Sequence, residues 1–342
     1  MNPYRLSTGQ RERNSSFLTA IGRLAPLMAD QKPSIVAAFA GTIVSAGASL
    51  VAPYLIGRAV DTYIRSGTYA ILPPLPFTPG IDGAGLVGAV GSDVRDFKSG
   101  DRVYFGGTVE GRAVGSYAAM ALCLPEQVHH LPQQVSFAQG AGLNVPYVTA
   151  WRALFEKGRA QPAETVLIHG ASGAVGVAAV QMARAAGLRV FGTAGTERGK
   201  KLAWDQGAHE VFDHTSAGYE KEVVAKPGGA GVDLVIEMLA NVNLMRDLEM
   251  IAKRGRVVIV GNRGSIEINA RAIMSKDAVV TGLTNWNATP KEMATAHAAI
   301  IAGMERSGYK PEVGKEMPLG DAPRAHEEVM KPGAYGKIVL IP

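Results

Sequence analysis

The chain has 342 residues, of which 47% are hydrophobic and 19% charged, and this composition excludes an intrinsically disordered protein. The single cysteine, Cys123, excludes a disulfide framework and a cysteine-cluster zinc site within the chain. A net charge of +5 is modest at this length, so the composition does not require nucleic-acid binding. The length suffices for two domains, each with its own core.

The N-terminal part has an unusual charge distribution. Residues 1–33 carry an excess of basic side chains, whereas residues 34–57 carry no charged side chain at all. As a helix, the uncharged stretch would extend roughly 36 Å, enough to cross a hydrocarbon core of about 30 Å. The alternative is a buried helix of a soluble domain, because the stretch is rich in alanine and glycine. We favour a membrane-type helix and predict that residues 1–61 form an N-terminal basic segment followed by this helix, with the N-terminus in the cytoplasm.

The rest of the chain changes in pattern near Val145. Residues 69–130 are rich in glycine, valine and proline, and the runs GLVGAVG (85–91) and DRVYFGG (101–107) indicate short strands. After Val145, mostly β-branched segments alternate with helical ones, and residues 175–186 have helical spacing. The strand-like segments are TVLIHG (165–170), LRVFGTAG (188–195), DLVIEML (233–239) and RVVIVG (256–261). This alternation predicts an α/β fold with a doubly wound parallel sheet.

The clearest chemical signal is the segment TVLIHGASGAVG (165–176), in which an apolar strand leads through a turn of small residues into a helix. Such a turn leaves backbone N–H groups and the positive end of the helix facing a site where a pyrophosphate fits. Glycine is needed there because a Cβ would obstruct the phosphates or the contact between helix and strand. Glycine-rich strand ends also occur in α/β folds that bind no nucleotide. The strand before the turn and the helix after it favour dinucleotide binding.

The end of the next strand indicates which dinucleotide binds. An NAD site usually has Asp or Glu there for the ribose 2′-hydroxyl, but this chain has GTAG (192–195) and no carboxylate before Glu197. Arg198, Lys200 and Lys201 follow, a cluster suited to a 2′-phosphate. The alternative is a solvated basic start of a helix. We favour NADPH as the cofactor.

From Thr62 to Pro342 the sequence resembles NADPH:quinone oxidoreductases of the zeta-crystallin type, which belong to the medium-chain dehydrogenase/reductase superfamily. The motifs that carry the resemblance are TYIRSGTY (62–69), TPGIDGAG (78–85), GDRV (100–103), HGASGAVG (169–176), GTAGTE (192–197), GAHEVF (207–212), EMLANVNL (237–244) and RGSIEIN (263–269). Ala174 departs from the family, which usually has a second glycine there. Alanine is small, so we expect the turn to persist.

The resemblance implies a catalytic domain built on a GroES-like β-barrel, with a Rossmann domain inserted into it. We expect the catalytic domain at residues 62–144 and 286–342 and the Rossmann domain at 145–285. The resemblance also implies that Tyr63 and Thr149 lie at the catalytic site, Thr149 beside the nicotinamide. The expected cofactor-binding residues are Tyr63, Thr149, Ser172, Gly173, Ala174, Val175, Gly176, Gly195, Arg198, Lys200, Lys201, His214, Asn243, Val260, Gly261, Asn262, Arg263, Leu283, Thr284 and Asn285. Considered alone, His214 would be a surface residue and Asn243 a helix cap.

A catalytic zinc is not expected. The zinc-dependent alcohol dehydrogenases of the superfamily have a histidine ligand where this chain has Ile81, and isoleucine cannot bind a metal. Without zinc, the expected reaction is hydride or electron transfer from NADPH to a small-molecule quinone, for which the protein supplies binding, orientation and a dry cleft.

The resemblance ends upstream of Thr62. Arg58 stands where the family has an active-site asparagine, and residues 16–64 resemble the first transmembrane helix region of an ABC exporter. We therefore interpret the chain as a chimera whose catalytic barrel is truncated, and we expect this truncation to lower quinone turnover.

Other functions are kept as alternatives. Reduction of an enone or an enoyl thioester would use the same cofactor half, and a non-catalytic protein that binds NADPH or AU-rich RNA is a further reading, although nucleic acid is not the expected partner. We expect a cytoplasmic homo-oligomer, with association to a membrane through residues 34–57.

Overall fold

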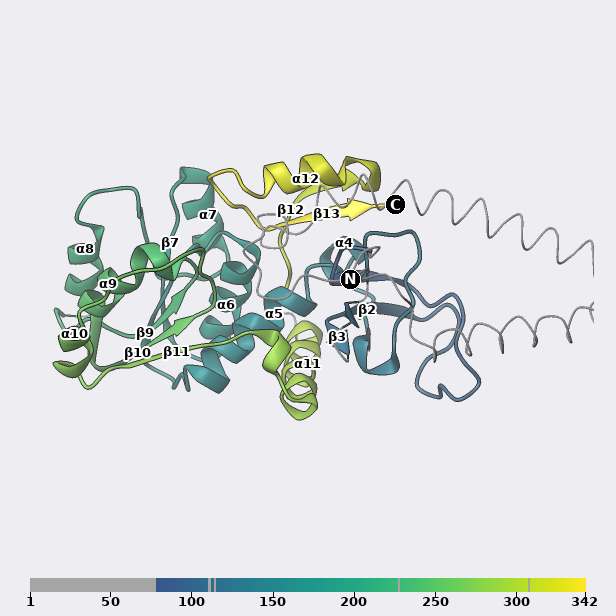
Figure 1. The fold of residues 1–342 in the computed structure, drawn as a ribbon, viewed down its shortest axis with the longest axis horizontal. Coiled ribbons are helices and arrows are strands. Elements are labelled where there is room, and N and C mark those ends of the chain that lie inside the picture. The colour runs from purple at the N-terminus through teal and green to yellow at the C-terminus, as the bar shows by residue number, and fades with distance from the viewer. Residues whose placement is uncertain (1–77, 110–111, 114, 227, 307) are drawn as a thin grey trace, which may run out of the picture. The chain divides into compact units, whose positions relative to one another are not determined.

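The computed structural model describes residues 78–342, apart from 110–111, 114, 227 and 307, and all of these belong to the unit Ile56–Pro342 (Figure 1). The expected membrane-type helix at 34–57, the junction with the exporter-like segment and the expected site residue Tyr63 lie outside the described residues. Within the described part, no helix combines the length and the apolar character needed to cross a membrane.

Six parallel strands form the main sheet, in the order β11-β10-β9-β6-β7-β8. The strands are β6 (Thr165–Ile168), β7 (Arg189–Thr193), β8 (Glu210–Phe212), β9 (Val232–Glu237), β10 (Ile251–Ile259) and β11 (Val279–Gly282). From β6 the chain winds outward through β7 and β8, and it then returns to the other side of β6 to form β9, β10 and β11. This order is the doubly wound arrangement that the sequence predicts.

The helices between the strands cover both faces of this sheet. They are α5 (Asn144–Trp151), α6 (Ala174–Ala185), α7 (Glu197–Asp205), α8 (Tyr219–Ala225), α9 (Ala240–Met250) and α10 (Ala270–Met274), and a π-helical turn, Arg152–Lys157, continues α5. The helix predicted at 175–186 is α6, shifted by one residue.

Strand β6 is buried along its whole length because both faces of the sheet are covered. Successive side chains of a strand point to opposite faces. Val166 and Ile168 accordingly join the apolar cluster that contains α6, whereas Leu167 joins the cluster with Phe191 and Leu248 on the other face. The continuous apolar run in the sequence thus reflects burial from two sides.

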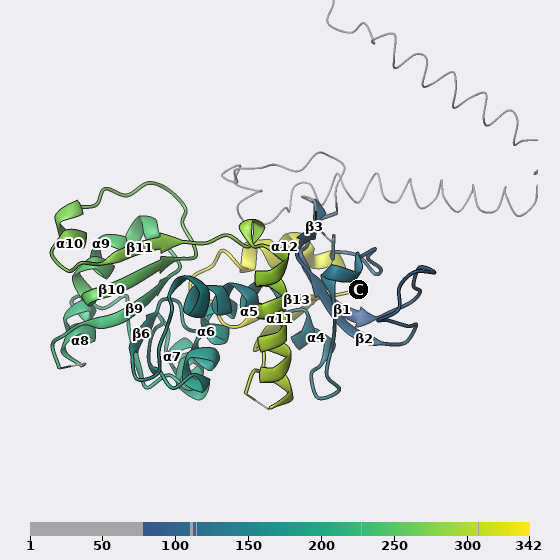
Figure 2. The same cartoon turned by 90° about the horizontal axis from the view of Figure 1, so that it is seen from below.

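A second part of the fold contains a three-stranded antiparallel sheet, in the order β1-β2-β5, and a parallel pair near the C-terminus. Its elements are β1 (Asp82–Leu86), β2 (Arg102–Gly106), β3 (Thr108–Val109), β4 (Arg112–Ala113), η2 (Pro125–Gln127), β5 (Val128–His130), α4 (Phe137–Gly140), η4 (Asn285–Asn287), α11 (Pro290–Glu305), β12 (Val313–Pro318), η5 (Leu319–Asp321), α12 (Ala322–Glu328) and β13 (Lys337–Ile341). Helix α11 lies beside α5 (Figure 2), and Ile300 of α11 belongs to the same core cluster as Val148 of α5.

The run DRVYFGG contains β2, and in the run GLVGAVG the strand β1 ends at Leu86 and a loop follows. Leu86 is 62% exposed and Val90 is 42% exposed, so the apolar residues of this run have no face to bury. Glycine weakens a strand that lacks such packing, and the segment forms a loop instead.

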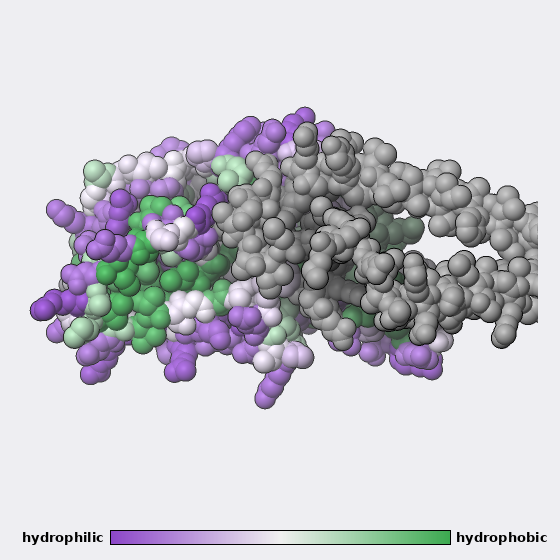
Figure 3. All heavy atoms as spheres, viewed as in Figure 1, coloured by the Kyte–Doolittle hydropathy of each residue, from purple (hydrophilic) through white to green (hydrophobic). Residues whose placement is uncertain are grey.

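Strand β11 lies at one edge of the six-stranded sheet, and Val279 on it is 51% exposed. Figure 3 shows a continuous apolar area on the face where Figure 1 draws α9, β10 and β11 toward the viewer. An open edge beside apolar surface is a feature that proteins commonly cover in an assembly.

Replacement of Leu167 by alanine tests the two-sided burial of the sheet. Leu167 is fully buried, so Leu167→Ala is expected to lower the free energy of unfolding by about 2–5 kcal/mol. Leu122, which is 95% exposed, is the matched control, and Leu122→Ala is expected to change stability by less than about 0.5 kcal/mol. Urea unfolding followed by circular dichroism measures both, and equal effects would contradict the described core.

Candidate functional site

The expected site residues in the described part gather at the carboxyl edge of the parallel sheet. Because the strands are parallel, the loops that follow them emerge at the same edge. Residues 172–176 follow β6; Gly195 and the three basic residues follow β7; His214 follows β8; Asn243 follows β9; residues 260–263 follow β10; and residues 283–285 follow β11. Thr149 reaches this edge from α5 through a hydrogen bond, Asn285 Nδ2 to Thr149 Oγ1, of 2.9 Å.

The turn between β6 and α6 requires glycine for geometric reasons. Gly170 has a φ of +59°, which side chains with a Cβ rarely adopt. A Cβ on Gly176 would lie 2.2 Å from Gly170 O, so the helix could not approach the turn so closely. The first amide of α6 to bond within the helix is that of Val177, which donates to Gly173 O at 2.8 Å. The parallel bridge between Gly173 and Gly336 engages the amide of Ala174, so the amides of residues 175 and 176 are left for a ligand at the start of the helix, and the alanine at position 174 is accommodated.

A segment near the C-terminus lies against this turn, which the sequence did not indicate. Ser172 Oγ donates to Ala334 O at 2.7 Å, and Gly336 N donates to Ser172 O at 2.7 Å. Ser172 is only 5% exposed, so its hydroxyl fastens residues 334–336 to the turn and is already engaged by a protein acceptor.

The three basic residues after β7 differ in their partners. Lys200 forms ion pairs with Glu197 and Asp213, and Lys201 pairs with Asp205 at 2.6 Å. Arg198 has no carboxylate partner among the described residues; its guanidinium lies 3.7 Å from the centre of the Tyr335 ring. Arg198 is therefore the member of this cluster whose charge is not offset.

His214 and Gly195 are neighbours at the ends of β8 and β7. A Cβ on Gly195 would lie 3.0 Å from His214 Nε2, so glycine permits this close approach. Burial lowers the pKa of His214, and the nearby His169 lowers it further. His214 is thus an exposed residue with a neutral ring at the edge of the sheet, which agrees with its reading as a surface residue when it is considered alone.

The loops after β9 and β10 hold each other. Ala240 N donates to Gly261 O at 3.0 Å, and a Cβ on Gly261 would lie 2.2 Å from Met238 O. Arg263 N donates to Asn241 Oδ1 at 2.9 Å, while Asn243 Nδ2 donates to Glu237 Oε1 at 3.2 Å. The predicted residues 260–263 and Asn243 therefore belong to one hydrogen-bonded unit.

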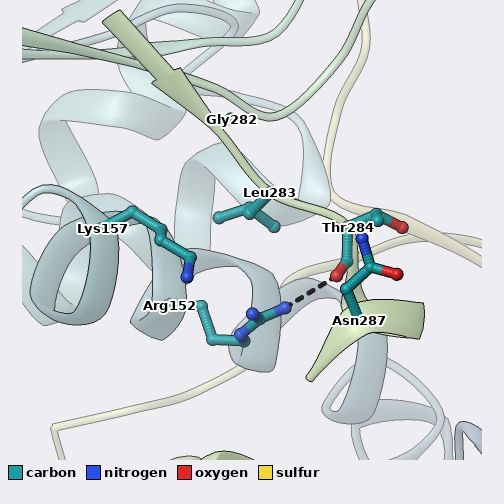
Figure 4. A pocket seen from close by; sticks show the side chains of 6 residues that line it. All are labelled: Arg152, Lys157, Gly282, Leu283, Thr284 and Asn287. Atoms are coloured by element: carbon teal, nitrogen blue, oxygen red, sulfur yellow. Dashed lines mark hydrogen bonds between the residues drawn. The ribbon is translucent and has the colours of Figure 1, made fainter. Parts of the chain in front are cut away.

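The loop after β11 borders a cavity of about 260 Å³ (Figure 4). The cavity is lined by Arg152, Lys157, Gly282, Leu283, Thr284 and Asn287. Arg152 is only 2% exposed; it donates to Thr284 O at 2.9 Å and forms two hydrogen bonds with Glu156. Burial raises the pKa of Glu156, but hydrogen bonds from Arg152 and Lys157 have the larger combined effect. The pKa of Glu156 is therefore lowered to about 2. Arg152 thus fixes the backbone of Thr284. The sequence analysis did not identify this role, because Arg152 and Thr284 are far apart in the sequence.

A buried group of three titratable residues lies beneath these loops and was also missed. His169 Nε2 is 2.8 Å from Asp247 Oδ1 and 3.4 Å from Glu237 Oε2. All three side chains are buried, and burial raises the pKa of both carboxyl groups and lowers that of the imidazole. Among the described residues, this is the one group of His, Cys, Asp and Glu with spacing suited to a metal ion. The histidine that ends TVLIH and the glutamate within DLVIEML, each next to apolar residues, were the available sequence signals.

Two known protein families match the sequence of this chain. The family described as "Alcohol dehydrogenase GroES-like domain" matches residues 57–133, and "Zinc-binding dehydrogenase" matches residues 174–302. The fold, a GroES-like part with a Rossmann sheet, is that of the medium-chain dehydrogenases/reductases. The first match begins upstream of Thr62, where we expected the resemblance to stop, and the exporter resemblance of residues 16–64 is not supported.

Similarity to individual proteins identifies the family within this superfamily more closely. The quinone oxidoreductase of Rattus norvegicus is 48% identical over 283 residues, which cover 82% of this chain and 85% of that protein. The structure of Escherichia coli quinone oxidoreductase complexed with NADPH is 30% identical, with a TM-score of 0.72 over 82% of this chain and 87% of that one. CurK enoyl reductase is 25% identical, with a TM-score of 0.73 and the same coverage. The chain belongs to the zinc-free quinone oxidoreductase family.

Metal independence is a testable consequence of Ile81. Because isoleucine replaces a required ligand, treatment with EDTA is expected to leave the thermal midpoint and any quinone reductase activity unchanged. Elemental analysis of the purified chain should find far less than one zinc per chain. Stoichiometric zinc, or a fall in the midpoint that added zinc reverses, would contradict this expectation.

Proposed function

We propose that this chain reduces quinones with NADPH as the electron donor and without a metal. The observation that carries the proposal is the strand–turn–helix at residues 165–176, which lies where the strand order reverses between β6 and β9. Open α/β sheets bind their ligands at this switch point, outside the carboxyl ends of the strands. The names of the relatives, and the NADPH in the Escherichia coli structure, support the same assignment.

The residues at this edge fit a bound NADPH. The amides of residues 175 and 176 would hold the pyrophosphate, and Gly195 and His214 would border the adenosine ribose. Thr149, whose hydroxyl accepts from Asn285, keeps its own proton as a donor for the nicotinamide end or for the substrate. Tyr63 is assigned to the same site from the resemblance alone. When bound, NADPH supplies the hydride; the chain supplies orientation and a site shielded from water.

Arg198 is the residue to which we assign recognition of the 2′-phosphate. Its planar guanidinium suits a phosphate, and its charge is not offset by a carboxylate of the described chain. Lys200 and Lys201 add positive potential but are each paired with acidic side chains.

The alternative substrate class is an activated alkene such as an enone or an enoyl thioester. The likeness to CurK enoyl reductase favours it, and the cofactor half would be identical. NADPH oxidation by the full chain, followed at 340 nm with 9,10-phenanthrenequinone or with an enoyl thioester, separates the two. Turnover of the quinone and none of the thioester is expected, and the reverse would overturn the quinone assignment.

Cofactor preference gives a second test. NADPH is expected to bind more tightly than NADH, and Arg198→Ala should weaken NADPH about tenfold or more, the equivalent of one charge-assisted hydrogen bond. Replacing Arg198, Lys200 and Lys201 together should weaken it further, whereas NADH should be little affected in either variant. Lys201→Ala alone is the matched control, because Lys201 is 74% exposed and paired with Asp205. Calorimetric titration measures these constants, and equal affinities of the unmodified chain for both cofactors would contradict the assignment.

Association remains a proposal of its own. We assign the open edge of β11 and the apolar area beside it to contact between copies of this chain, which agrees with the expected homo-oligomer. No described residue adds support for RNA binding, and the expected membrane contact depends on residues 34–57.

A further inference from the structure

The buried residues His169, Glu237 and Asp247 form a set of hydrogen bonds whose directions can be assigned. Gly170 N donates to Thr193 Oγ1 at 3.2 Å, and Thr193 Oγ1 lies 3.3 Å from His169 Nδ1. A carboxylate oxygen can only accept, so the ring nitrogen that faces Asp247 must donate, and in a neutral imidazole the opposite nitrogen, Nδ1, then accepts from the Thr193 hydroxyl. The other ring nitrogen, Nε2, then carries the proton of a neutral imidazole and donates to Asp247 Oδ1 at 2.8 Å.

The directions of the hydrogen bonds at the Glu237 carboxyl group can be assigned in the same way. Glu237 Oε1 accepts from Leu239 N and from Asn243 Nδ2. The remaining carboxyl oxygens, Glu237 Oε2 and Asp247 Oδ2, are both buried and have no donor among the described residues. Two buried acceptors cannot satisfy one another, because neither carries a proton when both groups are ionised. The two carboxyl groups lie within hydrogen-bonding reach of each other, so a single proton shared between them satisfies both.

Electrostatics favours the same protonation state. Two ionised carboxylates beside a neutral imidazole would put two negative charges into a region closed to water, which is costly. Neutralising one of them removes most of that cost. Burial raises the pKa of both groups to about 7; the hydrogen bond between them raises the pKa of Glu237 and lowers that of Asp247, and Arg246 lowers that of Asp247 further. We therefore place the proton on Glu237, because Asp247 Oδ1 accepts from His169.

Three of the predicted cofactor loops meet at this cluster. His169 and Gly170 begin the turn after β6, and Asn243 follows β9. The backbone oxygen of Glu237 accepts from Val260 N at 2.8 Å and from Gly261 N at 3.2 Å in the turn after β10. A change at the carboxyl pair would therefore reach all three loops at once.

We propose that His169, Glu237 and Asp247 are positioning residues that hold one shared proton and thereby fix the loops after β6, β9 and β10 in the geometry that NADPH requires. This inference rests on the proposed function only for the identity of the ligand. The cluster, as defined by these three side chains, takes no part in hydride transfer itself.

The pH dependence follows from the sign of the shifts. A carboxyl group with a raised pKa binds its proton more tightly in the folded than in the unfolded chain, whose glutamate titrates near pH 4.3. Stability is therefore lost as the pH rises from about 4 through the folded pKa. The other titratable or charged groups facing the cluster are His214 from the loop after β8, Tyr219 from α8 and Arg246 from α9. Burial lowers the pKa of His214 and raises that of Tyr219, so these two groups stay neutral over most of the range between pH 6 and 8.5.

The decisive variant is Glu237→Gln, because the amide reproduces the protonated carboxyl group. Its oxygen accepts from Leu239 and Asn243, and its NH2 group donates to Asp247 at any pH. At pH 6 the Glu237→Gln chain is expected to bind NADPH within about threefold of the unmodified chain. Glu237→Leu leaves these donors and Asp247 Oδ2 without a partner, and it should bind NADPH at least about tenfold more weakly. Above the folded pKa, the unmodified chain should lose NADPH affinity relative to Glu237→Gln by up to about tenfold per pH unit, the limit for one linked proton.

Two controls make the comparison specific. NADPH has a 2′-phosphate that titrates near pH 6, and this effect cancels in the ratio between the unmodified chain and Glu237→Gln. Glu164→Gln is the matched control, because it removes a partly buried ion pair with Arg256. The two hydrogen bonds of this pair, of 2.6 and 2.8 Å, lie just before the amino end of β6. That variant should lose stability and keep the pH profile of the unmodified chain between pH 5 and 8.5.

Thermal unfolding of the cofactor-free full-length chains tests the cluster without any ligand. The midpoint of the unmodified chain should fall relative to that of Glu237→Gln between pH 5 and 8.5. Parallel profiles in both unfolding and binding would overturn the shared proton, and so would one bound metal ion per chain that is lost on Asp247→Asn. If the unmodified chain binds no NADPH at any pH, the proposed function fails, and the unfolding profiles still decide the cluster.

Discussion

All six strands of the parallel sheet run in the same direction, so their carboxyl ends meet at one edge, and the functional account depends on this constraint. Loops that are more than a hundred residues apart in sequence converge there because the sheet order reverses at β6. A parallel sheet needs cover on both faces, and the two apolar clusters on either side of β6 supply it. The rigid body of the sheet then positions loops that have little packing of their own.

The site also depends on close contact between backbone segments, which glycine permits. A Cβ would lie 2.2 Å from Gly170 O at Gly176 and 2.2 Å from Met238 O at Gly261, so these glycines let α6 approach the turn before it and let the loop after β10 lie on the loop after β9. Residues 334–336 also lie directly against the turn after β6, where hydrogen bonds from the hydroxyl and to the backbone oxygen of Ser172 hold them. The C-terminal segment thereby ties the second part of the fold to the turn after β6.

The sequence predicted those features that depend on neighbouring residues. The strand, turn and helix at 165–176 are local, and the structure has them within two residues of the expected bounds. The buried cluster was not predictable in this way, because His169 and Asp247 are 78 positions apart, and neither Ser172 nor Ala334, 162 positions apart, indicates the other. The basic cluster after β7 shows the same limit. Glu197 and Asp205, three and four positions from their lysines, are local partners, whereas the pairing of Lys200 with Asp213 became visible only in three dimensions.

Hydrogen–deuterium exchange of the full-length chain, with and without saturating NADPH, tests the central claim most directly. A ligand protects the amides that it contacts or orders. The account predicts that protection concentrates in residues 169–176, 194–201, 213–215, 238–243, 260–263 and 283–285, and that the opposite edge of the sheet, including residues 159–164 and 226–231, is unchanged. Protection confined to other segments, or none at saturating NADPH, would contradict a cofactor site at the carboxyl edge of the sheet.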